Sequence, residues 1–116
     1  MIFKAEDVHE YILKSEKDKT DATVFFLKEL TGNVSNRVVD DAGYRDKENK
    51  FRIKMGESNK IILINCLVGW KNMKNKKGED VPFSCDKSQL LPPNVALELI
   101  GEINRISIVE EEEIKN

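Results

Sequence analysis

The stretch that decides the fold runs from Leu67 to Ile106 and reads LVGWKNMKNKKGEDVPFSCDKSQLLPPNVALELIGEINRI. It opens beside the single tryptophan of the chain, Trp70, and continues through a loop that is rich in lysine. It then reaches Pro92 and Pro93, after which apolar residues recur at helical spacing. The stretch therefore predicts an aromatic anchor, an exposed loop and a long helix, in that order along the chain.

The helix is the clearest element of the sequence, and its start has a simple explanation. A proline in the first turn loses no helical hydrogen bond, so Pro92-Pro93 is a favourable place to begin. We expect one apolar stripe to face the core, while Glu98, Glu102 and Arg105 face away from it. The stripe consists of Ala96, Leu99, Ile100, Ile103 and Ile106.

Two segments upstream of this stretch have the signature of strands. Thr23–Leu30 is rich in β-branched and aromatic residues, and strand periodicity places Phe25 and Leu27 on one face. Phe51–Met55 alternates apolar with basic side chains. We therefore predict an α+β fold, in which these two segments form a small antiparallel sheet that is packed by the C-terminal amphipathic helix and by one or two further helices.

The remaining segments are less well determined. Val8 and Ile12 recur at helical spacing and indicate a short helix near the start of the chain. Residues 34–41 predict another short helix, which Ser35 could cap. The apolar run Ile61–Val68 fits the end of a helix and a buried strand equally well, because it is rich in β-branched residues.

Length and composition indicate one folded unit. A chain of 116 residues suits a single domain, and 40% hydrophobic with 34% charged residues predicts a real core under a well-solvated surface. We expect residues 1–109 to form that domain. Residues 110–116 are expected to be an acidic tail, because the like charges of Glu110–Glu113 repel one another.

Composition also bears on location. The sequence contains no apolar run near the roughly 20 residues that a membrane helix needs, and its start lacks the pattern of a secretory signal. Cys66 and Cys85 are isolated in the sequence, which favours free thiols in a reducing compartment. We expect a cytoplasmic protein that has no membrane partner.

No catalytic signature is present in the sequence. His9 is the single histidine, and the spacing of histidine, cysteine and acidic residues does not match a metal site. No glycine pattern for phosphate binding occurs either. We therefore expect no catalytic residue, no cofactor and no metal, and a role that is not enzymatic.

The lysine-rich loop after Trp70 is the feature that could contact nucleic acid. Lysines neutralise phosphates and an aromatic ring can stack on a base. The loop ends in acidic residues and the whole chain has a formal net charge of −2, so a solvated loop is the favoured interpretation. A small regulatory or nucleic-acid-associated protein remains the alternative function. The lysines concerned are Lys71, Lys74, Lys76 and Lys77.

Two blocks of sequence together resemble a family of phage proteins. One is VGWKNMKNKKGEDVPF (Val68–Phe83), followed by LLPPNVALELIGEI (Leu90–Ile103) and an Ile-Ser close at Ile106 and Ser107. The other is TVFFLKELTG (Thr23–Gly32). The combination resembles small proteins of tailed bacteriophages and prophages that are grouped with tail assembly chaperones or minor tail proteins.

The resemblance implies a partner and a role. It implies protein–protein contacts with phage tail or other virion proteins, such as the tail tube or tape-measure protein, or with another copy, in the host cytoplasm or in the virion. It also implies a helix ahead of Gly69-Trp70. The sequence departs from the family pattern in its lysine-dense loop and in the longer segment Arg45–Lys60. The residues implied to form a fold-defining or partner-binding loop are Gly69, Trp70, Gly78, Pro82 and Phe83.

Overall fold

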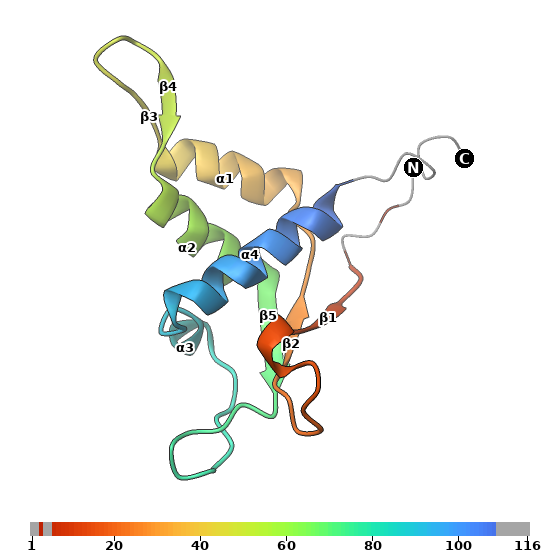
Figure 1. Ribbon diagram of the computed structural model, residues 1–116. Helices are drawn as coiled ribbons and strands as arrows, with labels where there is room; N and C mark the ends of the chain where they lie inside the picture. The colour runs from red at the N-terminus through yellow and green to blue at the C-terminus, as the bar shows by residue number, and fades with distance from the viewer. Residues whose placement is uncertain (1–2, 4–5, 109–116) are drawn as a thin grey trace.

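The computed structural model describes residue 3 and residues 6–108, and its architecture is α+β (Figure 1). Within these residues, a three-stranded antiparallel sheet has the order β1-β2-β5, and β3 pairs with β4 as a separate hairpin. The predicted α+β class with a long final helix is confirmed. The strands are β1 (His9–Ile12), β2 (Val24–Leu27), β3 (Gly43–Arg45), β4 (Phe51–Ile53) and β5 (Leu67–Lys71). The helices are the 3-10 turn η1 (Lys14–Glu16), then α1 (Gly32–Ala42), α2 (Met55–Cys66), α3 (Cys85–Ser88) and α4 (Pro93–Ser107).

The predicted pairing of the sheet is wrong, although both predicted strands exist. The segment Thr23–Leu30 contains β2 and the segment Phe51–Met55 contains β4, but the two lie in different sheets. β2 pairs with β1 and β5, whereas β4 pairs with β3 directly before it. A hairpin closes only a short loop, so this local pairing costs little chain entropy.

The short helix predicted near the start of the chain is also wrong. Residues 9–12 form the edge strand β1, with Tyr11 opposite Phe25 and Ile12 opposite Val24. Val8 and Ile12 are four residues apart, and that spacing satisfies a period of two as well as a helical period. A segment this short therefore follows whichever neighbour can pair with it.

The run Ile61–Val68 is divided between both interpretations. α2 continues to Cys66, and β5 begins at the next residue. The junction is fixed because the backbone N–H of Lys28 donates to the carbonyl of Cys66 at 2.8 Å. A helix thus precedes Gly69 and Trp70, as the family resemblance implied, but those two residues lie in a strand.

The helix predicted for residues 34–41 is present and starts earlier. α1 begins at Gly32, and the hydroxyl of Thr31 accepts a hydrogen bond from the N–H of Val34 at 3.4 Å. Thr31 is therefore the cap in place of Ser35. α1 packs against α2, and both lie on one side of the sheet in Figure 1.

The core lies where α4 crosses the sheet, and the predicted stripe supplies one side of it (Figure 1). Leu99 and Ile103 of α4 are fully buried, as are Phe25 and Leu27 of β2. Ile100 is buried as well, while Ala96 and Ile106 are half-buried at the margins. The acidic tail predicted for residues 110–116 lies outside the described residues.

Truncating a buried side chain of α4 should lower the free energy of unfolding more than truncating an exposed one. We expect Leu99→Ala to lower the free energy of unfolding by about 2–5 kcal/mol, because it leaves a cavity in a closed core. Leu97→Ala is the matched control on the same helix, since Leu97 is 58% exposed, and it should change stability by less than about 0.5 kcal/mol. Urea denaturation followed by circular dichroism measures both. Equal losses would contradict the placement of the core.

Candidate functional site

Trp70 connects the sheet to the long loop that follows it. Its indole is buried on β5, and its ring meets the ring of Phe25 edge-on with centroids 6.2 Å apart. The ring of Phe83 meets it edge-on from the loop side, with centroids 4.9 Å apart. The indole N–H donates to the carbonyl of Val81 at 2.8 Å. Trp70 therefore fixes both the second half of the loop and the end of the sheet.

The loop itself is a closed hairpin-like structure. The N–H of Val81 donates to the carbonyl of Met73 at 2.8 Å, and Lys74 forms an ion pair with Asp80 across the loop. The side-chain oxygen of Asn75 accepts from the N–H groups of Lys77 and Glu79 at 2.9 and 3.0 Å. Gly78 has φ of +79°, a conformation that other residues resist. The loop is held by its own polar groups.

The structure does not gather the five family-motif residues on one surface. Trp70 and Phe83 pack together inside, whereas Pro82 is exposed and Gly78 lies in the loop turn. Gly69 is on the opposite face of β5, where a Cβ atom would lie 3.2 Å from the Phe26 ring. These residues therefore act in packing and chain direction. The five residues therefore do not form one binding surface by themselves.

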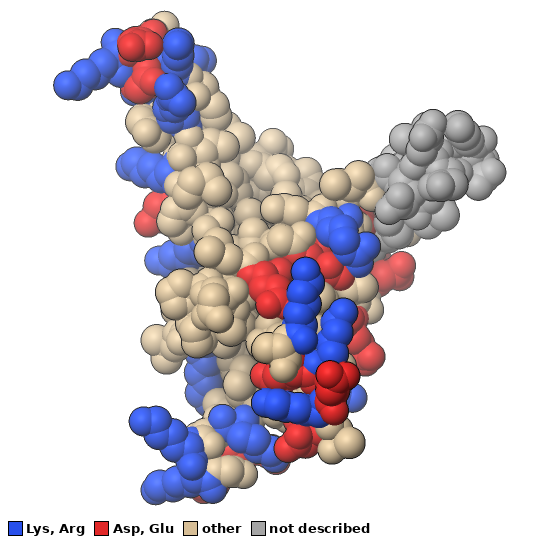
Figure 2. Space-filling view, viewed as in Figure 1, with Lys and Arg blue, Asp and Glu red and all other residues tan. Residues whose placement is uncertain are grey.

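The four loop lysines are exposed, but they do not surround an available aromatic face. Lys74 is paired with Asp80, while the side chains of Lys71, Lys76 and Lys77 form no hydrogen bond or ion pair within the described part of the chain. Figure 2 shows basic side chains gathered over this loop. Phe25 and Phe83 cover much of the Trp70 ring, which is 9% exposed, so little of it is available for a base to stack on.

Beside the loop is an apolar groove, which we call the Trp70 groove. It has a volume of about 270 Å³ and lies between the loop, the segment after α3 and the start of α4. Trp70 and Met73 line it from the sheet side, and Leu91 and Pro92 from the helix side. Sequence reasoning missed this groove, because nothing in the residue pattern brings Leu90-Leu91 next to Trp70.

A second surface that the sequence did not predict is the hairpin of β3 and β4. This arm, residues 43–54, projects from the junction of α1 and α2 away from the sheet (Figure 1). The side chains of Tyr44, Phe51 and Ile53 are 44%, 45% and 38% exposed. Met55, which directly follows the arm, is 65% exposed. The chain thus leaves large apolar side chains uncovered on both faces of a projecting element. Phe51 and Ile53 share one face, whereas Tyr44 pairs with Arg52 and lies on the other.

The turn of the arm is built around Asp46. Its carboxylate accepts from the N–H groups of Glu48 and Lys50 at 2.9 Å each, and from the guanidinium of Arg52 at 2.9 Å. The hydrogen bond from Arg52 is the main cause that lowers the pKa of Asp46. Asn49 supplies the left-handed residue of the turn, with φ of 63°. An aspartate followed three residues later by asparagine is a turn signal that could have identified this hairpin from sequence.

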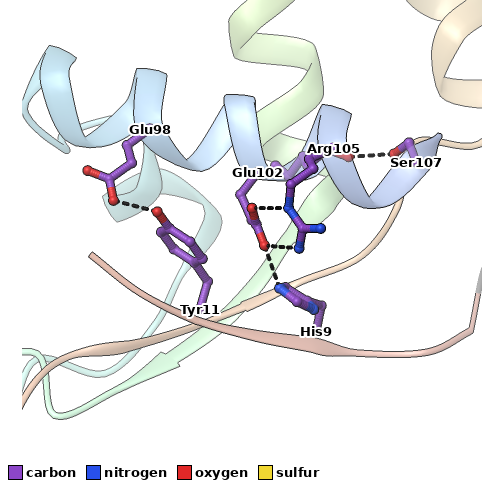
Figure 3. Close-up of polar contacts among 7 residues, drawn as sticks. His9, Tyr11, Glu98, Glu102, Arg105 and Ser107 are labelled. Carbon is purple, nitrogen blue, oxygen red and sulfur yellow. Dashed lines mark hydrogen bonds and ion pairs between the residues drawn. The ribbon is translucent and has the colours of Figure 1, made fainter. Parts of the chain in front are cut away.

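Polar side chains connect β1 with α4, and this corrects the prediction for Glu98 and Glu102. Both carboxylates point toward β1 and not away from the protein (Figure 3). Glu98 accepts from the hydroxyl of Tyr11 at 2.6 Å and from the N–H of Lys14 at 2.9 Å. Glu102 contacts His9 at 2.7 Å. An edge strand that supplies several donors turns these carboxylates inward.

Arg105 of α4 adds to these contacts between β1 and α4. Its guanidinium donates twice to Glu102, at 2.7 and 2.6 Å, and these bonds are the main cause that lowers the pKa of Glu102. The bond from Tyr11 is the main cause that lowers the pKa of Glu98. Burial, followed by the Glu98 hydrogen bond, raises the pKa of Tyr11 to about 12. The carboxylates are therefore engaged in fastening β1 to α4.

Neither thiol lines the Trp70 groove or belongs to the arm, and the same is true of the histidine. Cys66 is fully buried, and burial raises the pKa of its thiol to about 11. Cys85 is exposed at the start of α3, and His9 is bound to Glu102. Among the described residues, no three histidine, cysteine or acidic side chains are grouped so that they could hold a metal ion. No helix in residues 6–108 is long and apolar enough to cross a membrane.

No protein-family model matches the chain, and neither a curated protein nor a solved structure was found to be similar to it.

The contacts between β1 and α4 predict that Tyr11 ionises at a higher pH than an ordinary tyrosine. In a Tyr44→Phe background Tyr11 is the single remaining tyrosine, and its phenol should ionise with a pKa of about 12. Glu98→Gln should lower this pKa in part, because it removes a charged acceptor that favours the neutral phenol, while burial, the larger cause, remains. Absorbance at alkaline pH, with circular dichroism to follow folding, measures both variants. Ionisation near pH 10 in both would contradict the Tyr11–Glu98 contact.

The sign of the pH dependence follows from these shifts. The Tyr11 contribution to stability is present below pH 10 and is lost as pH rises toward 12. Glu98 and Glu102 have lowered pKa values, so their contribution is present above the usual carboxyl pKa and is lost on acidification below it.

Proposed function

We propose that this chain is a non-enzymatic assembly protein of a tailed phage or prophage, and that it acts by holding another tail protein through the β3–β4 arm. The observation that carries the proposal is the uncovered pair Phe51 and Ile53, which share one face of a projecting hairpin. Tyr44 is exposed on the other face, and Met55 is exposed directly after the arm. Such a group favours contact with another protein, because exposed apolar surface of this kind is covered when a partner binds.

The energetics of the arm support a docking role. Each of its strands has three residues, and an isolated hairpin of that size is marginally stable in water. Completing the burial of a half-exposed apolar side chain contributes about 1 kcal/mol, so several of them together could support a reversible contact. The cost of ordering the arm is small, because Asp46 already fixes its turn.

The net positive charge of the arm indicates the charge that a partner surface should carry. Residues 43–54 contain five basic side chains and two acidic ones. The surface that covers the arm should therefore be apolar at its centre and acidic at its rim. Charge complementarity between two protein surfaces mainly orients the partners and raises the association rate, and it contributes less to the affinity.

The phage assignment rests on the family resemblance of Val68–Phe83, Leu90–Ile103 and Thr23–Gly32. A tail assembly chaperone would cover apolar surface of its partner until that partner polymerises, and would then leave. A minor virion component would keep the same contact permanently. The partner is the tail tube protein, the tape-measure protein, another virion protein or a second copy, and the place of action is the host cytoplasm or the virion.

The test is capture of the tagged chain from its own host after prophage induction, with mass spectrometry of the bound proteins and blotting of purified particles. We expect tail proteins to be recovered with the natural sequence. The arm variant Phe51→Thr, Ile53→Thr, Met55→Gln should lose them, because it removes apolar area without adding charge.

Two control variants separate the arm from other surfaces. Leu97→Gln changes an equally exposed apolar residue on α4 and should leave capture unchanged. Replacing Lys71, Lys74, Lys76 and Lys77 with serine should also leave it unchanged, and nucleic-acid retention that falls steeply with salt and depends on these lysines would favour the alternative function. Absence of any tail protein from the capture would overturn the phage proposal.

A further inference from the structure

The Trp70 groove has an apolar floor and lysines in its lining, and these two properties indicate what kind of molecule could bind there. Its floor is apolar, and Leu90 at its edge is 81% exposed. Two lysines, Lys74 and Lys87, line it as well. A molecule that fits this groove needs apolar side chains for the floor and negative charges for the edge.

Lysines lie at the groove and in the loop beside it, and the two that line the groove already have partners. Lys74 is paired with Asp80, and Lys87 donates to the carbonyl of Pro82 at 3.3 Å. Further along the loop, Lys76 and Lys77 have no side-chain partner within the described residues. Lys76 and Lys77 therefore add positive charge to the loop that borders the groove, a loop that also carries Glu79 and Asp80.

The sequence contains a segment with the matching chemistry. Residues 108–116 read IVEEEEIKN, with apolar residues on both sides of four glutamates. Ile108, the last described residue of the chain, is itself 64% exposed. Four glutamates against one lysine give this segment the opposite charge to the loop around the groove.

Geometry decides which copy of the segment can occupy the groove. The groove lies at the first residues of α4, beside Pro92, whereas the segment leaves from the other end of that helix. A helix of 15 residues is about 22 Å long. A fully extended chain from Ile108 reaches about 18 Å by Glu113. The loop that carries the lysines lies farther from the C-terminal end of α4 than the start of α4 does (Figure 1), so a second copy is favoured over the same copy as the source of the segment.

We propose that the Trp70 groove of one copy binds residues 108–116 of a second copy. The apolar side chains of the segment enter the groove, and its glutamates lie over the lysines of the loop. Such a contact joins one end of α4 to the opposite end of α4 in the next copy, so it is head-to-tail and produces a ring or an open chain of copies. The inference does not depend on what the β3–β4 arm binds.

The first test uses the synthetic peptide IVEEEEIKN and the fluorescence of Trp70, the single tryptophan of the chain. The peptide should bind to a protein that ends after Ile108, and the matched peptide IVQQQQIKN should bind much more weakly. Lys76→Ser with Lys77→Ser should weaken binding about tenfold, since two exposed ion pairs together contribute roughly that factor. Leu90→Ser should weaken it without changing its salt dependence. Equal binding of both peptides would overturn the proposal.

The second test measures the mass of the full chain in solution by sedimentation velocity over a range of protein and salt concentrations. We expect association that grows with concentration, weakens with salt and disappears when the chain ends after Ile108. Reversing Lys76 and Lys77 to glutamate should abolish association, and changing Glu111 and Glu112 to lysine in the same chain should restore it. Circular dichroism confirms that each variant is folded.

Three results would overturn the proposal. One is a full chain that stays monomeric at every concentration and whose shortened form does not bind the peptide. Another is an oligomer that persists without residues 109–116. The last is a full chain that stays monomeric although its shortened form binds the peptide, because the segment would then occupy the groove of its own copy.

Discussion

The position of the Trp70 indole is the constraint on which most of the structure depends. It lies on the last strand of the sheet, so its ring can contact Phe25 of β2 and Phe83 of the loop at the same time. Its single polar group is satisfied by Val81. Without that ring, the loop would lose its connection to the sheet, and the groove beside α4 would lose its floor.

Sequence reasoning succeeded where one short-range pattern decides the outcome. α4 was predictable because a proline opens it and five apolar residues follow at one helical period, and Leu99 and Ile103 are buried as that pattern requires. Strand alternation placed Phe25 and Leu27 on the same face of β2, and the structure shows that this is the buried face. The α+β class was predictable from these elements together.

The failures concern contacts between distant segments, which a pattern within one segment does not encode. β1 was interpreted as a helix because four residues cannot distinguish the two periods, and its pairing with β2 decided the matter. Glu98 and Glu102 were expected to face solvent, but Tyr11 and His9 lie 87 and 93 residues away in sequence and bind them. The Trp70 groove was missed for the same reason, since it exists only after the loop and the start of α4 have packed. The arm is a local hairpin, and its turn signal at Asp46 and Asn49 was overlooked.

The net charge is small, but the charged residues are unevenly distributed over the protein. A total of −2 suggested a chain without strong electrostatic preference. In space, basic side chains are concentrated on the arm and on the loop after β5, which project in opposite directions from the core (Figure 2). Four glutamates are concentrated in residues 110–113. Near-neutrality therefore results from the cancellation of separate regions of opposite sign, and such a chain can be soluble as a monomer while each region still selects an oppositely charged partner over a neutral one.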